Sequence, residues 1–194
     1  MDVEKITLNK KSITDFAAER NKLLAKAKTE WVLFVDLDEE ISPELEREIR
    51  EIGENQGYQG YRIKRRDWFM GRWLKYGETG NIKLLRLGKK GAGVWKRKVN
   101  EVWEIWNVGE FRGKLLHYPH KNIAEFIKKI NFYSDLDIGE FGGFRGFGLI
   151  KPVAKFFLNY FLKLGFLDGF PGFVMAFMMS FQSLVVRVKQ FEKK

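Results

Sequence analysis

One short segment constrains the fold of this chain more than any other. Trp31 to Val35 (WVLFV) is a continuous apolar run, which is typical of a strand buried on both faces between helices. The preceding residues, Thr14 to Ala27, have apolar side chains at helical spacing and Asp15 near the start, which predicts a helix. After the strand, Ser42 is a predicted helix N-cap and Pro43 the first helical residue. This succession predicts an α/β fold with a parallel core sheet.

The rest of the chain divides into a strand region and a helical region. Between residues 58 and 118, short alternating or apolar runs are separated by Gly-containing turns, which predicts small, partly antiparallel strands. A Gly-rich stretch at 139–148 predicts a flexible break. Two strongly apolar helices are expected beyond it, at 149–167 and 171–188.

Charge and aromatic content point to an anionic partner. The 194 residues carry a formal net charge of +10, which suits nucleic acid, a phospholipid surface or a phosphorylated small molecule. The segment 141–194 holds 12 of the 18 phenylalanines, with eight basic and two acidic residues. Basic charge combined with dense apolar content favours an anionic membrane surface, and no nucleic acid is expected as a partner.

Composition also limits the chemistry and the location. The chain has no cysteine, which excludes disulfides and thiolate chemistry, and its two histidines are too few for a His-rich zinc site. A hard metal held by oxygen ligands is compatible with it. Met1 is not followed by a basic and then an apolar segment, so no signal peptide is predicted. We expect a cytoplasmic protein, peripheral on the inner face of the cell membrane.

The acidic segment after the buried strand is the most informative candidate site. In extended backbone, residues two apart point the same way, so Asp36 and Asp38 are predicted to present their carboxylates to one cation, or through it to a diphosphate. The carboxyl end of a strand in an α/β sheet is also where ligands bind. The alternative is a solvated turn that leads into the next helix.

Four separated segments resemble one known family. DFAAERN (Asp15 to Asn21) and WVLFVDLDEEISPEL (Trp31 to Leu45) resemble the region of family 2 glycosyltransferases that contains their metal-binding Asp-x-Asp motif. EFIKKINFYS (Glu125 to Ser134) and YFLKLGFLDGFPGF (Tyr160 to Phe173) resemble later helices of the branch that builds lipopolysaccharide core and related cell-envelope saccharides. The resemblance spans the chain from about Thr14 to its end.

The resemblance implies a GT-A type fold, here a partial Rossmann-like sheet with flanking helices, and an inverting transfer from a nucleotide-sugar donor. By position, Asp36 and Asp38 would hold Mg²⁺ or Mn²⁺ on the donor diphosphate. Arg20 and Asn21 match the family's Arg-Asn pair, which places them with Asp36 as donor-binding residues. The alternative is that Arg20 and Asn21 fix their helix against the Asp-x-Asp loop.

The acceptor half of the site is less closely matched. Inversion requires a carboxylate that deprotonates the acceptor hydroxyl, and in this branch a His-Glu pair follows a strand. Here the matching pair is Asn100-Glu101, so Glu101 is the candidate catalytic base. An exposed strand acid is the alternative for Glu101. Four tryptophans are candidates for an acceptor platform, with core packing as the alternative: Trp68, Trp73, Trp103 and Trp106.

The start of the chain departs from the family. Its members open with a strand, helix and strand that hold the nucleotide base and ribose, and residues 2–11 do not resemble that segment. We therefore expect a truncated glycosyltransferase domain over 1–140 and a membrane-associating helical region over 141–194. The expected partners are a nucleotide-sugar donor, a saccharide or lipid-linked acceptor, an anionic membrane surface and, for a split enzyme, a separate N-terminal half. A non-catalytic membrane-surface binding module is the alternative function.

Overall fold

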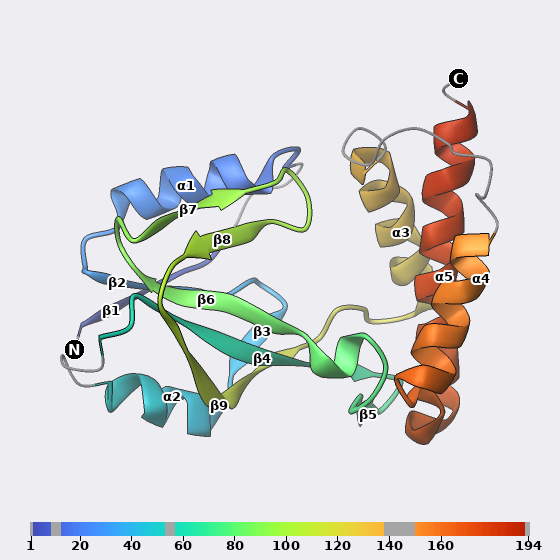
Figure 1. The fold of residues 1–194 in the computed structure, drawn as a ribbon, viewed down its shortest axis with the longest axis horizontal. Helices are drawn as coiled ribbons and strands as arrows, with labels where there is room; N and C mark the ends of the chain where they lie inside the picture. Colours follow the sequence, from blue (N-terminus) through green and yellow to red (C-terminus); the bar gives the residue numbers. More distant parts are fainter. Residues whose placement is uncertain (1, 9–12, 53–56, 138–149, 193–194) are drawn as a thin grey trace. The chain divides into compact units, whose positions relative to one another are not determined.

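The computed structural model describes residues 2–8, 13–52, 57–137 and 150–192 (Figure 1). They form two compact units: unit 1 is Met1–Arg65 with Ile82–His117, and unit 2 is Arg66–Asn81 with Tyr118–Lys194. In chain order the elements are β1 (Val3–Ile6), α1 (Phe16–Lys26), β2 (Trp31–Phe34), β3 (Glu39–Ile41), α2 (Pro43–Arg50), β4 (Gly60–Phe69), β5 (Arg72–Trp73), η1 (Thr79–Asn81), β6 (Lys83–Lys89), β7 (Gly93–Lys96), β8 (Val102–Ile105), β9 (Val108–His117), α3 (Ile123–Asp137), α4 (Ile150–Phe157), η2 (Leu158–Leu162), η3 (Gly165–Asp168) and α5 (Gly169–Glu192).

The mixed α/β architecture and the apolar C-terminal helix are as predicted, and the predicted helix starts are confirmed by their caps. Asp15 Oδ1 accepts a hydrogen bond from Ala18 N at 2.9 Å at the start of α1. Ser42 Oγ accepts from Leu45 N at 3.2 Å at the start of α2, with Pro43 in its first turn. Each cap satisfies an N–H group that has no partner within its helix.

The main sheet is mixed, which corrects the expected parallel core. Its strands follow the order β1-β2-β6-β4-β9-β3, and β5 pairs with the end of β4. β1 runs parallel to β2, with Val3 opposite Trp31, whereas β6 runs antiparallel to β2 on its other side. The middle of the chain thus supplies long central strands of the same sheet, and only β7 and β8 form a separate hairpin.

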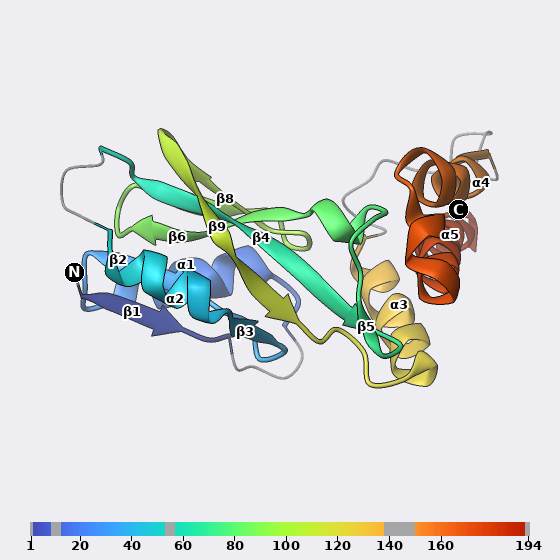
Figure 2. The ribbon, with the colours of Figure 1, turned by 90° about the horizontal axis from the view of Figure 1, so that it is seen from below.

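The two N-terminal helices cover opposite faces of the sheet, as Figures 1 and 2 show. Trp31, Leu33 and Val35 pack in one cluster with the apolar stripe of α2. Val32 and Phe34 point to the other face, where they pack with α1 and with the β7–β8 hairpin. All five residues are buried, so β2 is covered on both faces as its apolar run predicts.

In unit 2 the predicted helix at 149–167 is broken. α4 ends at Phe157, a short π-helical segment (η2) follows, and Leu164 takes a positive φ of 58°. The chain then folds back over Leu164 to Gly169, within the run Tyr160 to Phe173 that resembles later helices of the family. Asp168 Oδ2 accepts from the main-chain N–H groups of Lys75 and Tyr76, at 2.9 and 2.8 Å. The predicted break at 139–148, and the boundary expected between residues 140 and 141, lie outside the described residues.

A glycine makes this fold-back possible. A Cβ at Gly172 would lie 2.0 Å from the carbonyl oxygen of Gly165, so a side chain at 172 would force η3 and α5 apart. Asp168 is 1% exposed, and its own carbonyl accepts from Arg72 Nη1 at 3.0 Å. The Leu-Gly-Phe-Leu-Asp-Gly run therefore joins the C-terminal helices to the segment that follows β5.

Candidate functional site

The acidic segment forms a turn at the end of β2. Val35 N donates to Ile6 O, and the turn at Leu37 and Asp38 closes where Glu39 N donates to Asp36 O, each at 3.0 Å. The expectation of extended backbone through this segment is therefore wrong. Asp36 and Asp38 have different neighbours.

Asp36 bridges two buried arginines that come from different elements. Its Oδ1 accepts from Arg20 Nη2 at 2.7 Å, and its Oδ2 accepts from Arg86 Nη2 at 2.8 Å. Arg20 lies on α1 and is 2% exposed, and Arg86 lies on β6 and is 6% exposed. Both oxygens of this carboxylate thus form charge-assisted hydrogen bonds within unit 1.

Two glutamates complete the cluster. Arg20 Nε donates to Glu101 Oε1 at 2.8 Å, and Arg86 Nη1 lies 3.9 Å from the same oxygen. The fully buried side chain of Glu39 accepts from Asp36 N at 3.1 Å and lies 3.8 Å from Arg86 and 3.9 Å from Arg65. Three carboxylates and three guanidinium groups therefore meet at the carboxyl end of β2. We call Arg20, Asp36, Glu39, Arg65, Arg86 and Glu101 the ion cluster.

Aromatic rings support the buried cations. The Arg20 guanidinium lies 4.8 Å from the ring centroid of Trp95 and 5.4 Å from that of Phe34. Trp95 stacks on Trp103 with 5.1 Å between centroids. Cation–π contacts of this kind stabilise a guanidinium that has left water. Trp103 is therefore a core residue at the back of the cluster and not part of an exposed acceptor platform.

The other tryptophans of the predicted platform are divided between the two units. Trp106 is 88% exposed in unit 1, and no ring pair involving it occurs among the described residues. In unit 2, Trp68 and Trp73 meet edge to face at 5.0 Å, and Tyr118 lies 5.4 Å from Trp73. Unit 2 thus contains an aromatic group formed by Trp68, Trp73 and Tyr118.

Asn21 has a main-chain role. Its Nδ2 donates to Trp95 O and its Oδ1 accepts from Trp95 N, both at 2.9 Å. The side-chain amide thus pairs with the backbone of β7 as a neighbouring strand would, and ties α1 to the hairpin. Of the matched Arg-Asn pair, Arg20 reaches the acidic turn and Asn21 holds the helix that carries it.

Asp38 lies beside the cluster and not in it. Its side chain is 37% exposed, and its Oδ2 lies 3.6 Å from His117 Nε2. The pairing of β3 with β9 places Glu39 opposite His117, which brings the histidine next to the turn. Asp38 is thus the more exposed of the two predicted metal-binding carboxylates.

The arginines set the charge state of Asp36. Burial alone would raise the pKa of its carboxyl, but the nearby Arg86 and Arg20 guanidinium groups outweigh it and hold the pKa below the usual value. Burial would likewise lower the pKa of Arg86, and Asp36, Glu39 and Glu101 outweigh it, so this pKa is raised. Asp36 and Arg86 are therefore a stable ion pair at neutral pH.

This shift predicts a pH-dependent stability. The pKa of Asp36 is lower in the folded chain than in the unfolded one. The ionised carboxylate therefore contributes fully to the free energy of unfolding above its ordinary pKa of about 4, and this contribution is lost as pH falls through the folded-state pKa. Asp36→Asn should destabilise the chain at neutral pH and progressively less in acid. Urea unfolding across this range measures the difference. Asp2→Asn, a change of an exposed acid, should leave the pH profile as in the wild type.

Several polar atoms of the cluster have unmet hydrogen-bonding capacity. Arg20 Nη1, both Nε and Nη1 of Arg86, and Glu39 Oε1 are buried without a hydrogen-bond partner among the described residues. Buried polar atoms are nearly always satisfied by protein or water. The cluster is therefore a place where water or a polar ligand completes the network.

Asp36 and Asp38 suit a metal ion that arrives bound to a substrate better than one held permanently by the protein. Within the described parts of the chain, no group of three or more His, Asp or Glu residues is arranged to hold a metal ion. The Asp36 oxygens bind arginines, which leaves Asp38 as the more accessible carboxylate. Mg²⁺ on a nucleotide commonly takes one or two protein carboxylates and obtains its other ligands from phosphates and water. Asp38 suits that arrangement.

Sequence reasoning missed Arg86. It stands in the apolar run of β6, among Leu84, Leu85 and Leu87. A charged residue at a buried strand position requires a partner of opposite charge, and this was the available signal. The partner could not be named from the sequence, because the pairing of β6 with β2 joins distant segments.

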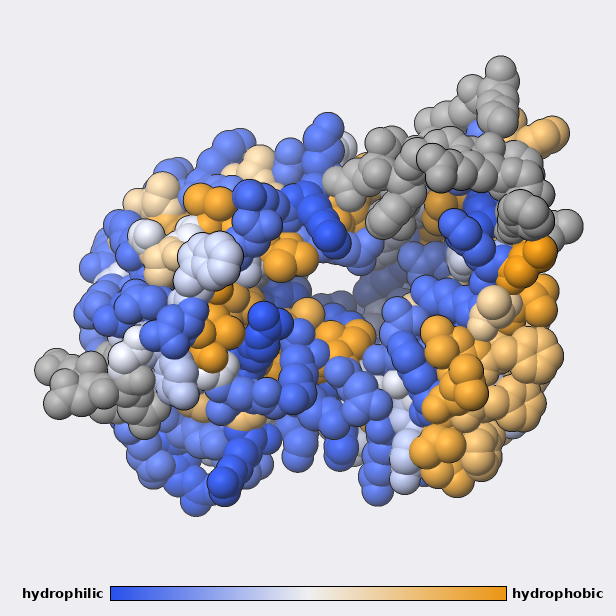
Figure 3. Space-filling view, viewed as in Figure 1, coloured by the Kyte–Doolittle hydropathy of each residue, from blue (hydrophilic) through white to orange (hydrophobic). Residues whose placement is uncertain are grey.

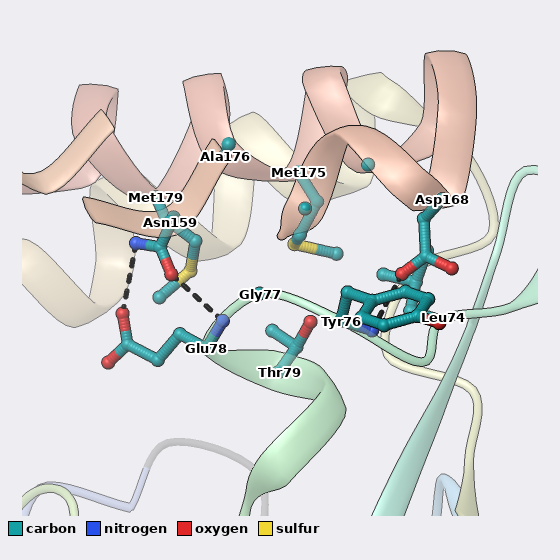
Figure 4. Close-up of a pocket in the computed structure, with 12 residues that line it drawn as sticks. Leu74, Tyr76, Gly77, Glu78, Thr79, Asn159, Asp168, Met175, Ala176 and Met179 are labelled. Carbon is teal, nitrogen blue, oxygen red and sulfur yellow. Dashed lines mark hydrogen bonds between the residues drawn. The ribbon is translucent and has the colours of Figure 1, made fainter. Parts of the chain in front are cut away.

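A pocket in unit 2 is not the predicted site. Its cavity volume is about 10 Å³, far below the roughly 300–1,000 Å³ of typical small-molecule pockets. Figure 4 shows Asn159, whose amide accepts from Glu78 N at 2.8 Å, and Asp168 at its wall. Its described lining includes none of the predicted site residues. We assign it to the packing of η1 against the C-terminal helices.

Comparison with known proteins adds a family context to the ion cluster. No protein-family model matches the chain. The chain is similar to rickettsial proteins named as glycosyltransferases. It is 30% identical over 171 residues to an uncharacterized glycosyltransferase of Rickettsia typhi, and likewise to one of Rickettsia prowazekii. With one of Rickettsia bellii it shares 28% identity over 186 residues.

The similarity covers most of the chain but only part of these relatives. It includes 78% of the chain in the first two comparisons and 79% in the third. The chain spans 59% of the length of each rickettsial relative.

Proposed function

We propose that the chain belongs to an inverting family 2 glycosyltransferase with a GT-A fold, from the branch that builds lipopolysaccharide core and related envelope saccharides. In this reaction an acceptor hydroxyl attacks the anomeric carbon of a nucleotide-sugar, and the bond to the diphosphate breaks. The relatives named as glycosyltransferases support transfer of a sugar in general. The sequence resemblance around the acidic turn supports the family.

One observation carries the proposal. Arg20 donates to Asp36 through Nη2 and to Glu101 through Nε. One guanidinium group therefore binds both Asp36, which is predicted to bind the nucleotide-sugar, and Glu101, the predicted catalytic base. These residues come from α1, the turn after β2 and the loop before β8. They meet at the carboxyl end of β2, a strand covered on both faces, and α/β folds bind ligands at such strand ends.

Each residue has a proposed role. Asp38 would hold the metal, Mg²⁺ or Mn²⁺, on the donor diphosphate, with Asp36 beside it. The metal supplies neutralisation of charge on the leaving diphosphate. Arg20 orients Asp36 and Glu101, and Glu101 accepts the proton of the acceptor hydroxyl as the new glycosidic bond forms. We place this reaction at the inner face of the cell membrane.

A second candidate function follows from the hydrogen bonds within the ion cluster. Since both oxygens of Asp36 are bound by arginines, the cluster is also compatible with a purely structural role. The chain would then be a non-catalytic module that binds a membrane surface. Calorimetry with UDP- and ADP-sugars in the presence of Mn²⁺ separates the two functions, because only the enzyme binds a donor in a metal-dependent way.

Asp38→Ala tests the donor site. We expect metal-dependent donor binding to fall at least tenfold while the thermal midpoint stays near that of the wild type, because the side chain is partly exposed. Isothermal calorimetry and thermal unfolding measure the two effects. Glu40→Ala changes an exposed acid two residues away and should keep wild-type affinity. Unchanged donor affinity in Asp38→Ala would remove Asp38 from the site.

A further inference from the structure

The exposed side of α5 is an apolar stripe along its whole length. Gly165–Glu192, which is η3 with α5, is long and apolar enough to cross a membrane by length and composition, yet only 22% of its most apolar window is buried. The exposed large side chains are three, four or seven residues apart, so they share one face of the helix. They are Phe170, Phe173, Phe177, Phe181, Val188 and Phe191.

A second stripe runs along α4 and η2. Ile150, Val153, Phe157 and Phe161 are exposed at the same helical spacing, and Leu162 is 76% exposed. Ser180 of α5 donates to Pro152 O of α4 at 2.7 Å, which fixes the two helices side by side. Figure 3 shows apolar residues gathered over these helices, at the lower right. We call the two rows together the apolar stripe.

Basic residues outnumber acids in the segment that carries the apolar stripe, although Lys155 pairs with Glu78 at 3.5 Å and Lys189 pairs with Asp135 at 2.7 Å. Residues 150–192 contain five basic residues, Lys151, Lys155, Lys163, Arg187 and Lys189, and two acids, Asp168 and Glu192. Asp168 is buried and accepts main-chain hydrogen bonds, so Glu192 is the one exposed acid of this segment. A surface that combines phenylalanines with lysines matches an anionic lipid leaflet.

The opposite face of α5 packs on α3, whose exposed residues are both apolar, such as Ile127 and Phe132, and polar. Met175 and Met178 lie in one cluster with Phe126 and Ile130 of α3. Lys189 Nζ donates to Asn131 Oδ1 and to Asp135 Oδ1 of α3, each at 2.7 Å. The exposed side of α3 carries Lys128 and Asn131. If α5 crossed a bilayer in this arrangement, α3 would carry these polar groups into hydrocarbon, which is costly.

We propose that the apolar stripe inserts into one leaflet of an anionic phospholipid membrane, with α4 and α5 lying along the surface and α5 not crossing it. About 36 Å of α5 would then contact lipid, and α3 faces water. Amphipathic helices bound in this way sink about 5–10 Å into the boundary between headgroups and acyl chains. The inference deepens the membrane location proposed above, and it stands or falls independently of sugar transfer.

Vesicle flotation of the full chain tests the surface. The wild type should float with phosphatidylglycerol vesicles, bind phosphatidylcholine vesicles less, and be partly released by high salt. The double variant Phe170→Asp/Phe177→Asp should bind at least tenfold more weakly, and Phe177→Asp alone less tightly than the wild type. Trp106→Asp, the same kind of change at an exposed tryptophan of unit 1, should bind as the wild type does. A double variant that folds and floats like the wild type would overturn the proposal.

The absence of natural cysteines allows a direct test of insertion. Lys163→Cys and Glu192→Cys bracket α5, and both positions are exposed. After binding to sealed vesicles, an impermeant maleimide added outside should label both cysteines. Protection of either one until the vesicles are lysed would mean that α5 spans the bilayer. Failure of the wild type to bind any vesicle would also refute the proposal. A dimer in solution would then identify a second copy of the chain as the partner of the stripe.

Discussion

Arg86→Met is expected to destabilise unit 1 by about 3–5 kcal/mol, because it removes one partner of a buried ion network. Arg86 lies 2.8 Å from Asp36 and within 4 Å of Glu39 and Glu101. Without it, one oxygen of Asp36 loses its cation, and the fully buried Glu39 side chain keeps the Asp36 N–H at 3.1 Å and Arg65 at 3.9 Å. Urea unfolding at neutral pH measures the loss as a lower midpoint at an unchanged slope.

A matched control distinguishes the network from the general effect of losing an arginine. Arg62→Met makes the same replacement at an exposed position of β4, and surface changes of this kind cost about 0.5 kcal/mol or less. Arg86→Lys retains the charge but not the paired donors, so it should fall between the two. An Arg86→Met protein as stable as the Arg62→Met protein would show that the ion cluster contributes no net stability.

Local signals in the sequence predicted most of the helices and the central strand. Asp15 and Ser42 each place an oxygen over the first turn of a helix, and the structure has both caps. The run Trp31 to Val35 predicted burial on both faces, and all five residues are buried. These features depend on neighbours within a few residues, which a sequence displays directly.

Strand pairing was harder to predict. β1 has four residues and was missed, and β6 was expected as one of several small, partly antiparallel strands but its pairing with β2 was not predicted. Neighbours in a sheet are chosen by burial and by contacts between distant segments. The expected parallel core was wrong for that reason. The predicted helix at 149–167 is interrupted before the fold-back at Asp168. The N–H groups that Asp168 binds, those of Lys75 and Tyr76, are far from it in the sequence, so this contact was not predicted.

The candidate site shows the same division. Family resemblance selected Arg20, Asp36 and Glu101, and the structure brings these three together. Residue spacing placed Asp38 beside Asp36, and the structure gives the two carboxylates different partners, His117 for Asp38 and two arginines for Asp36. The long-range partner Arg86 had only an indirect signal, an arginine within an apolar strand. Assignment of the metal and of the base remains a prediction.

Glu101→Gln is expected to lower the rate of sugar transfer by about 10²–10⁴-fold while donor binding and stability change little. Glutamine keeps an oxygen that can accept from Arg20 Nε, as Glu101 Oε1 does at 2.8 Å, but it cannot take up the proton of the acceptor hydroxyl. Loss of transfer with retained donor binding therefore reports on proton removal. The measurements are donor calorimetry, thermal unfolding and transfer by a preparation that glycosylates an acceptor.

Glu104→Gln is the matched control for that variant. Glu104 lies on β8, three residues after Glu101, and its half-exposed side chain pairs with Lys96 at 2.6 Å. Surface ion pairs of this type contribute about 0–1 kcal/mol, so transfer and stability should both stay near wild-type values. If Glu101→Gln weakens donor binding and stability as much as it slows transfer, Glu101 is a structural member of the ion cluster. If only Glu101→Gln slows sugar transfer and Glu104→Gln does not, Glu101 is the residue that removes the proton.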